Sequence, residues 1–286
     1  MLNRNQRLLL GAATSTAALL GGVSLLRARA KAQAHARRVR KGMFIEYGLF
    51  DEPARELREL GIEWVLVQTG VQSVDKSPDD FVWRTKEQMS KLYRRLNPAG
   101  ATSRIELWGW GWPIPTGSME FAEHVRSVLS SQFVTGYCLN VERKSWDYNH
   151  LGAFKTDQAA HLLVNEIRKG SKKPLTLSSH GRADLHDAMP WSALRTLDGA
   201  LPQAYDKDNR YGDGFIERCI DSYRGKGFDA VYPTLGATKS SATRVAEQLR
   251  QFPAGVLGVS WWSWTSIGRS EAMKAAIADW RRSWEV

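Results

Sequence analysis

From Gly42 onward, short apolar runs alternate along the chain with amphipathic stretches. The apolar runs have the length and composition of buried strands, and the stretches between them repeat apolar residues at the helical spacing. The predicted strands are residues 43–48, 62–70, 103–111, 134–142, 174–181, 197–206, 229–237 and 256–264. The predicted helices are 51–60, 83–96, 121–132, 156–170, 186–195, 214–225, 242–252 and 271–284, the fifth being the weakest. Eight strands, each followed by a helix, predict an α/β fold of the (β/α)8 TIM barrel type.

A doubly wound open sheet is the alternative for a chain in which strands and helices alternate. That fold would need a phosphate-binding glycine turn after its first strand, and residues 49–54, LFDEPA, contain no glycine. Glycines also stand where helices should end, at Gly61, Gly100, Gly170 and Gly227. The pattern therefore favours the barrel.

The first 41 residues differ from the rest in charge. They hold nine of the 40 Lys and Arg residues and no acidic residue, so the rest of the chain is close to neutral. Residues 8–26 are uncharged and rich in Leu, Ala and Gly, which is typical of a secretory signal or a weak membrane anchor. We therefore assign residues 1–41 to a basic signal peptide or anchor plus linker, and 42–286 to the barrel. The protein is expected to be exported, to the periplasm or the cell exterior, or to be tethered to a membrane.

The net charge of +10 does not indicate nucleic-acid binding by the barrel, because the excess lies in the N-terminal segment. That segment alone could contact an anionic membrane or polymer. The two cysteines, Cys138 and Cys219, are expected to form no disulfide, and their spacing fits no metal site. We expect a monomer without metal or cofactor.

Active sites of (β/α)8 barrels lie at the C-terminal ends of the strands. The candidates at those ends are Glu46, Gln68, Trp108, Trp110, Glu142, His180, Gln203, Tyr205, Asp206 and Trp262. On the fourth strand, alternation places Glu142 with Gly136, Cys138 and Asn140, on the face opposite a bulky apolar set. The bulky set suits packing under helices, so Glu142 is predicted to point into the barrel mouth.

Several of these candidates have two interpretations. Trp108, Trp110 and Trp112 alternate along one face, and they either fill the barrel mouth or stack on a ligand. His180 either contacts substrate or is structural, and no second histidine completes a metal site. Glu106 and Cys138 are expected deeper in the barrel, in structural roles.

Three stretches resemble a known family. Residues T135-G-Y-C-L-N-V-E142 resemble the D-G-x-D-x-D-x-E strand-four signature of glycoside hydrolase family 18, the chitinase-like barrels. Q203-A-Y-D206 resembles its strand-six motif, and G258-V-S-W-W-S263 resembles the strand-eight stretch whose Trp floors the sugar site. N140-V-E142 is also similar to the D-x-E motif of family 25, the muramidase-like barrels that cleave peptidoglycan.

The resemblance implies hydrolysis of an N-acetylated polysaccharide, peptidoglycan or a chitin-type glycan. The seventh strand carries no glutamate to act as nucleophile, so the acetamido group of the substrate would attack instead. Glu142 would be the acid, and Asn140, Tyr205 and Asp206 would hold the acetamido group. The implied sugar contacts are Glu46, Trp108, Trp110, Gln203, Trp262 and His180.

The chain also departs from the family pattern. Thr135, Cys138 and Asn140 stand where the family has aspartates, so the negative charge beside the acid is missing. Asp206 or Glu46 could replace that charge if either reached the same pocket. The alternative, from a different class of protein, is a catalytically inactive carbohydrate-binding barrel. A polybasic membrane or nucleic-acid binder is a third hypothesis, based on residues 1–41 alone.

Overall fold

The computed structural model describes residues 39–46, 53–72, 81–113, 118–142, 156–206, 210–238, 240–253 and 256–280. The chain divides into two units, Met1–Val39 and Arg40–Val286. The predicted signal or anchor, residues 8–26, lies outside the described residues. Within the described ranges, no helix is both long and apolar enough to cross a bilayer.

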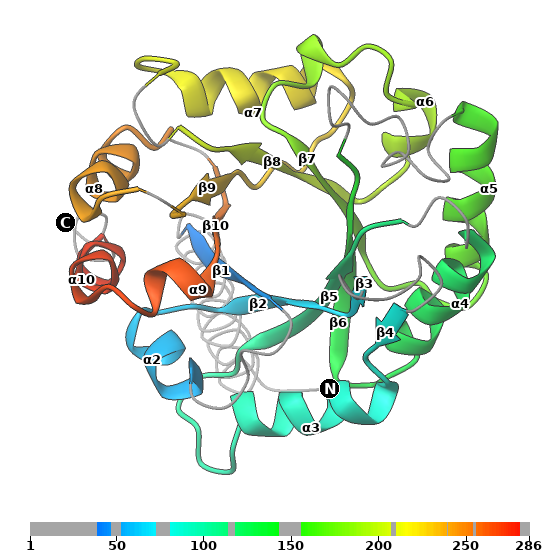
Figure 1. Cartoon of the computed structure of the whole chain (residues 1–286), viewed down its shortest axis with the longest axis horizontal. Coiled ribbons are helices and arrows are strands. Elements are labelled where there is room, and N and C mark those ends of the chain that lie inside the picture. The colour runs from blue at the N-terminus through cyan, green and yellow to red at the C-terminus, as the bar shows by residue number, and fades with distance from the viewer. Residues whose placement is uncertain are drawn as a thin grey trace, which may run out of the picture. The chain divides into compact units, whose positions relative to one another are not determined.

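Arg40–Val286 contains a closed barrel of eight parallel strands in the order β1-β10-β9-β8-β7-β6-β5-β2 (Figure 1). The strands are β1 (Arg40–Ile45), β2 (Trp64–Gln68), β5 (Glu106–Gly111), β6 (Val134–Asn140), β7 (Leu175–His180), β8 (Gly199–Ala204), β9 (Thr234–Gly236) and β10 (Gly258–Trp262). Each overlaps one predicted strand. The (β/α)8 barrel is therefore confirmed.

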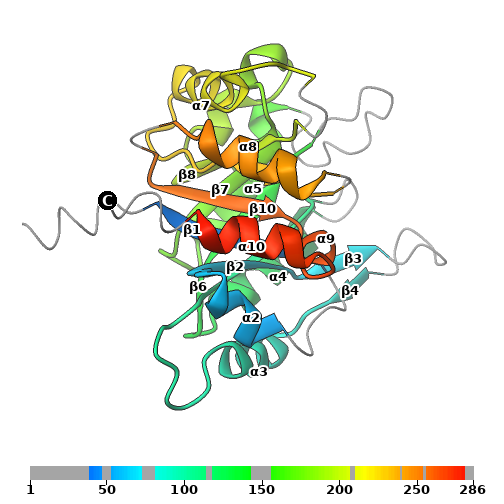
Figure 2. The ribbon, with the colours of Figure 1, turned by 90° about the vertical axis from the view of Figure 1, so that its left-hand side faces the viewer.

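Helices surround the barrel and cover its outer face (Figures 1 and 2). They are α2 (Pro53–Glu59), α3 (Lys86–Leu96), α4 (Ser118–Leu129), α5 (Asp157–Arg168), α6 (Trp191–Leu194), α7 (Phe215–Gly225), α8 (Ala242–Arg250) and α10 (Glu271–Asp279). The weak fifth prediction, residues 186–195, is a single turn, α6, preceded by the 3-10 turn η2 (Ala183–Leu185). Pro190 lies immediately before α6. Proline has no backbone N–H to donate to the preceding turn, and its ring clashes with that turn, so the helix does not extend toward the N-terminus.

Besides η2, the periodicity missed three short elements. β3 (Gly70–Gln72) and β4 (Phe81–Trp83) form an antiparallel pair between β2 and α3, and Figure 2 shows the pair extending beyond the barrel. α9 (Trp264–Ile267) follows β10 directly. Three or four residues are too few for either period to be recognised.

Two of the predicted helix-ending glycines do end helices. Gly61 follows α2 with a φ of 73°. Its N–H donates to the Arg58 carbonyl at 2.9 Å, and the Ile62 N–H donates to the Leu57 carbonyl at 2.8 Å. Gly227 ends α7 in the same way. This pair of bonds satisfies carbonyls that a helix end would otherwise leave unpaired, and it requires the left-handed conformation that glycine adopts readily.

The N-terminal end of the barrel interior is filled by large aromatic side chains that face glycines on neighbouring strands. A Cβ on any of these glycines would overlap the facing ring. The pairs are Trp64 with Gly42, Trp108 with Gly136, and Tyr232 with Gly258. Large residues opposite small ones fill the interior at high density without a pore. The inward glycines of β1, β6 and β10 are therefore packing positions.

The barrel begins earlier than the sequence predicted. Arg40 and Lys41, assigned above to the basic linker, form the start of β1, where they pair with Gly258 and Val259 of β10. The Lys41 side chain is buried, and its ammonium donates to the Ile277 carbonyl at 2.5 Å near the end of α10. A cation at the carboxyl end of a helix meets favourably oriented carbonyl dipoles. The boundary therefore moves from residue 42 to residue 40.

Candidate active site

Glu142 lies at the C-terminal end of β6, two residues beyond the strand, and its side chain points into the barrel mouth. Its Oε1 accepts a hydrogen bond from Nε2 of Gln203, which comes from β8. The same Nε2 lies 3.1 Å from Oδ1 of Asn140 and 3.4 Å from Oγ of Ser178. Because β7 separates β6 from β8, these contacts cross the interior. The inward orientation predicted for Glu142 is confirmed.

The outward face of β6 explains why the strand takes this orientation. Tyr137 points away from the barrel axis and contacts Phe121 of α4 with a centroid separation of 6.2 Å. Its hydroxyl lies 2.7 Å from Oγ1 of Thr69. A Cβ on Gly109 would lie 2.6 Å from the Tyr137 ring, so the glycines of the W-G-W-G run leave room for this tyrosine. With Tyr137 fixed outward, Asn140 and Glu142 are directed inward.

Tyr205 directly follows β8, the strand that carries Gln203. Gly236 of β9 gives it room, since a Cβ there would come within 3.1 Å of the Tyr205 ring. Burial, reinforced by the negative charges of Glu142 and Glu46, raises the pKa of Tyr205 well above its usual value. The phenol therefore keeps its proton at neutral pH and can donate a hydrogen bond to a ligand.

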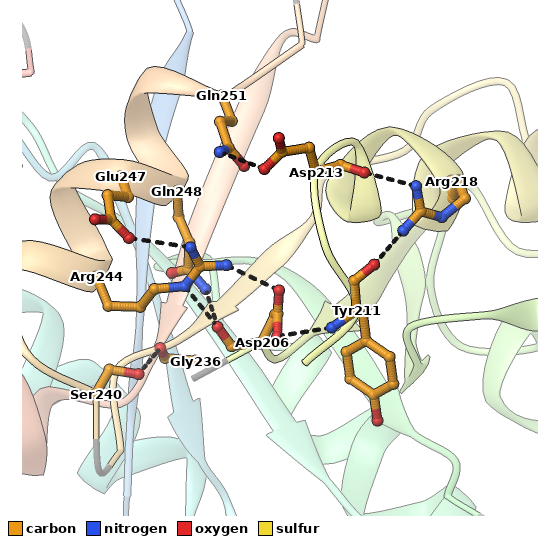
Figure 3. Close-up of polar contacts among 10 residues, drawn as sticks. All are labelled: Asp206, Tyr211, Asp213, Arg218, Gly236, Ser240, Arg244, Glu247, Gln248 and Gln251. Atoms are coloured by element: carbon orange, nitrogen blue, oxygen red, sulfur yellow. Dashed lines mark hydrogen bonds and ion pairs between the residues drawn. The ribbon is translucent and has the colours of Figure 1, made fainter. Parts of the chain in front are cut away.

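Asp206 does not belong to this site, which corrects the sequence prediction. Its carboxylate is buried away from the mouth, and Oδ2 lies 2.8 Å from Nη2 of Arg244 in α8 (Figure 3). Nε of Arg244 and Nε2 of Gln248 each donate to the Asp206 carbonyl at 3.0 Å. These contacts direct Asp206 toward α8, whereas the Tyr205 ring packs over Gly236 of β9. Asp206 fastens α8 to the end of β8.

Aromatic side chains line the base of the mouth. Trp262, at the end of β10, is partly exposed and packs against Trp110 at 5.1 Å and Phe44 at 5.4 Å between ring centroids. Trp110 has no exposed surface, and its indole N–H donates to the Ile45 carbonyl at 3.3 Å. The predicted sugar contact at Trp110 is therefore wrong, because this ring supports Trp262 from beneath.

Trp108 and Trp112 lie at different depths of the same row. Trp108 contacts Trp64 at 6.4 Å and donates to Glu106 at 3.4 Å, both at the N-terminal end of the strands. The predicted sugar contact at Trp108 is wrong for that reason. Trp112 is 43% exposed and packs edge-on against Trp110 at 5.1 Å. Trp112 is not among the predicted sugar contacts, although its place just beyond the strand end is visible in the sequence.

Glu46 follows β1 and belongs to the mouth. Its Oε2 accepts hydrogen bonds from the hydroxyls of Ser263, at 2.8 Å, and Thr265. Ser263 follows Trp262 directly, through a cis peptide bond. The segment that carries the Trp262 ring thus also holds the Glu46 carboxylate. Neither hydroxyl was identified from the sequence, because the contact joins residues more than 200 positions apart.

His180 ends β7 and is partly exposed. Its ring stacks on His186 with a centroid separation of 4.3 Å, and its backbone carbonyl accepts a hydrogen bond from Tyr223 at 2.6 Å. Within the described ranges, no group of three or more His, Cys, Asp or Glu side chains lies close enough together to hold a metal ion. A role for His180 in substrate binding stays a prediction.

The two cysteines are free and buried, as the sequence predicted for a chain without a disulfide. Cys138 lies beneath Asn140 in the barrel interior, and burial raises the pKa of its thiol to about 12. Burial has the same effect on Cys219 of α7. Both thiols stay protonated at neutral pH, so neither is a nucleophile for the site.

Comparison with known proteins identifies solved structures that share the fold of this chain. No protein-family model matches this chain, and no curated relative matches it. A GH18 chitinase from Pseudoalteromonas aurantia is 14% identical with a TM-score of 0.53, over 84% of this chain and 99% of that one. The catalytic domain of a hyperthermophilic chitinase from Pyrococcus furiosus is 12% identical with a TM-score of 0.54, over 88% and 97%.

A different glycosidase family is similar to the same extent. The GH113 β-mannanase from Alicyclobacillus acidocaldarius is 12% identical with a TM-score of 0.56, over 87% of this chain and 97% of the mannanase. At these identities the similarity shows a shared fold. The chain has the (β/α)8 architecture of the glycoside hydrolase barrels.

Proposed function

We propose that this protein is a retaining glycoside hydrolase that cleaves an N-acetylated polysaccharide, peptidoglycan or a chitin-type glycan, with Glu142 as the acid. The observation that carries this proposal is the position of Glu142. It lies at the C-terminal mouth of a glycosidase-type barrel, bonded to Gln203 and beside the protonated phenol of Tyr205. Trp262 offers a partly exposed ring at the base of the same mouth.

The substrate itself would supply the nucleophile of the first step. The acetamido oxygen attacks the anomeric carbon, the glycosidic C–O bond breaks, and Glu142 donates its proton to the departing oxygen. Water then attacks the anomeric carbon, gives a proton back to Glu142, and opens the five-membered ring that the acetamido group had formed. Tyr205 would donate to the acetamido group. Gln203 would hold Glu142 and Asn140 in register, since its Nε2 bonds to both.

A signal or anchor at residues 8–26 would bring such an enzyme to a cell-wall polysaccharide. The alternative is a carbohydrate-binding barrel without catalysis, which the neutral residues Thr135, Cys138 and Asn140 favour. The two differ in one respect that can be measured. An enzyme turns the ligand over, whereas a binding module releases it unchanged.

The test compares wild type with Glu142→Gln on chitooligosaccharides and on purified peptidoglycan. Glutamine keeps the shape and the bond to Gln203 but cannot donate the proton. Cleavage should fall about 10²–10⁴-fold, the usual contribution of a positioned general acid, with ligand affinity little changed. Glu106→Gln is the matched control, because it removes a carboxylate at the opposite end of the barrel.

Product analysis separates the outcomes. Wild type should release products that retain the anomeric configuration. Binding without any cleavage would support the carbohydrate-binding barrel. Cleavage that survives Glu142→Gln would show that another residue is the acid.

A further inference from the structure

The proposed reaction creates a positive charge that the described polar side chains nearest Glu142, those of Gln203, Asn140 and Ser178, do not balance. When the acetamido oxygen has attacked, the five-membered ring that forms is a cation. Asn140, buried two residues before Glu142, can hydrogen-bond to this ring but carries no charge. A fixed negative charge facing a developing cation is among the largest contributions that an active site makes. The position of another carboxylate at the mouth therefore decides how well the site can work.

Asp206 is not available for this role. Its carboxylate is buried with the guanidinium of Arg244, and Oδ1 lies 3.4 Å from the Tyr211 N–H (Figure 3). Turning it toward the mouth would leave the buried Arg244 without that partner, which costs several kcal/mol. Of the two carboxylates that the sequence offered as substitutes, Glu46 is left.

Glu46 is held at the mouth from two directions. Along β1 it shares a face with Phe44, two residues earlier, and Phe44 packs inside the barrel against Trp262. From the other side, the hydroxyls of Ser263 and Thr265 both donate to its Oε2. Two donors on one oxygen fix the carboxylate beside the ring that would carry the sugar. Its placement is thus tied to that of Trp262.

Glu46 and Glu142 also come from opposite parts of the barrel. β1 and β6 are separated by β2 and β5 on one side and by four strands on the other. Both charges act on Tyr205, since each contributes to the raised pKa of its phenol. A sugar resting on Trp262 beside Tyr205 would therefore meet carboxylates that come from two separate parts of the barrel.

We propose that Glu46 is the residue whose negative charge stabilises the cationic intermediate, taking the role that the neutral Asn140 cannot fill. The inference rests on the proposed function, because it assigns the missing charge of that same reaction. Glu46 forms no covalent bond. It faces the cation while Glu142 donates and recovers the proton, and the charge of the cation disappears when water adds to the anomeric carbon.

The test uses the full chain and three variants: Glu46→Gln, Asn140→Asp, and the double variant. Glu46→Gln should lower kcat about 10²–10³-fold with little change in KM, because its charge acts on the intermediate rather than on bound substrate. Asn140→Asp in the Glu46→Gln background should recover at least tenfold of that loss, since it restores a charge beside Glu142. Glu106→Gln, which removes a carboxylate at the far end of the barrel, is the control.

A binding measurement separates this inference from the proposed function. Wild type should bind 2-acetamido-1,2-dideoxynojirimycin, a protonated iminosugar, more tightly than neutral chitotriose, and Glu46→Gln should remove the preference. If no substrate is cleaved but this preference is present and lost in Glu46→Gln, the charge role stands and the hydrolase proposal fails. The inference is overturned if Glu46→Gln keeps wild-type kcat and preference. It is also overturned if a folded Glu46→Gln loses activity that Asn140→Asp does not recover.

Discussion

At the scale of single residues, Glu142 and Asp206 show how carboxylates that follow two strands of the same barrel can lie in different surroundings. Glu142 is partly exposed and bonded to the neutral amide of Gln203, as the proposed function requires of a group that meets a ligand. Asp206 is 2% exposed and paired with the buried guanidinium of Arg244. A buried carboxylate bonded to a permanent cation contributes to the integrity of the fold, because either charge alone would be buried without its partner.

Replacing Asp206 should therefore affect stability first. Asp206→Asn leaves the Arg244 charge buried without its carboxylate, and the free energy of unfolding should fall by about 3 kcal/mol. Urea denaturation followed by fluorescence measures this. Glu247→Gln is the matched control, because Glu247 bonds to the same guanidinium from an exposed position, and it should cost less than about 1 kcal/mol. An Asp206→Asn variant as stable as wild type but inactive would return Asp206 to the active site.

At the scale of elements, α4 supports the site from outside by packing on β6. Its buried face includes a titratable side chain, His124, which is 9% exposed. Burial lowers the pKa of His124 from 6.5 to about 4, because the charged imidazolium is poorly solvated there. The folded protein thus keeps His124 neutral at pH values where the unfolded chain protonates it.

This makes stability depend on pH in a defined window. The contribution of neutral His124 is complete above pH 6.5, where both states are unprotonated, and is lost as the pH falls toward 4. Over that window, this group alone should lower the free energy of unfolding by about 3 kcal/mol. Denaturation of His124→Leu at pH 7 and pH 4.5 should show a smaller difference than wild type. Val128→Ala, a buried and non-titrating change on the same helix, should keep the wild-type difference.

At the scale of the whole molecule, the unit that contains the barrel begins at Arg40. Contacts divide the chain at Val39, and β1 begins with two residues of the basic segment. Lys41 connects the start of β1 to the last turn of α10, and it lies 5.5 Å from the Trp280 ring centroid. Lys41 is assigned to a basic linker from the sequence, but its charge belongs to the barrel.

Two truncations should therefore behave differently. A chain that begins at Val39 should unfold with the same midpoint as the full chain. A chain that begins at Gly42 should lose roughly 2 kcal/mol or more, because the charged hydrogen bonds of Lys41 are removed. Thermal melting followed by circular dichroism measures both, and Lys41→Met in the Val39 chain isolates the side chain. A Val39 chain that melts well below the full chain would show that the first unit packs on the barrel.

Much of the fold could be predicted because it depends on short-range periodicity. All eight strands and the order of helices between them follow from apolar spacing and from glycines such as Gly61 and Gly227. The site was predictable only to the level of strand ends. That rule selected Glu142, Gln203 and Trp262, which the structure has at strand ends, and it also selected Trp108, which lies near the N-terminal end of its strand. Alternation gives the side of a strand, but it does not give depth along the axis.

By itself, the sequence determined the barrel, the inward direction of Glu142 and the separation of a basic segment from a nearly neutral body. Tertiary structure alone decided which side chains meet. Asp206 is held by Arg244, 38 residues later, and Glu46 by Thr265, 219 residues later. Such contacts depend on where closure of the barrel brings distant strand ends, and no local pattern records that. The physical reason is that periodicity arises from neighbours along the chain, whereas pairing of buried charges arises from neighbours in space.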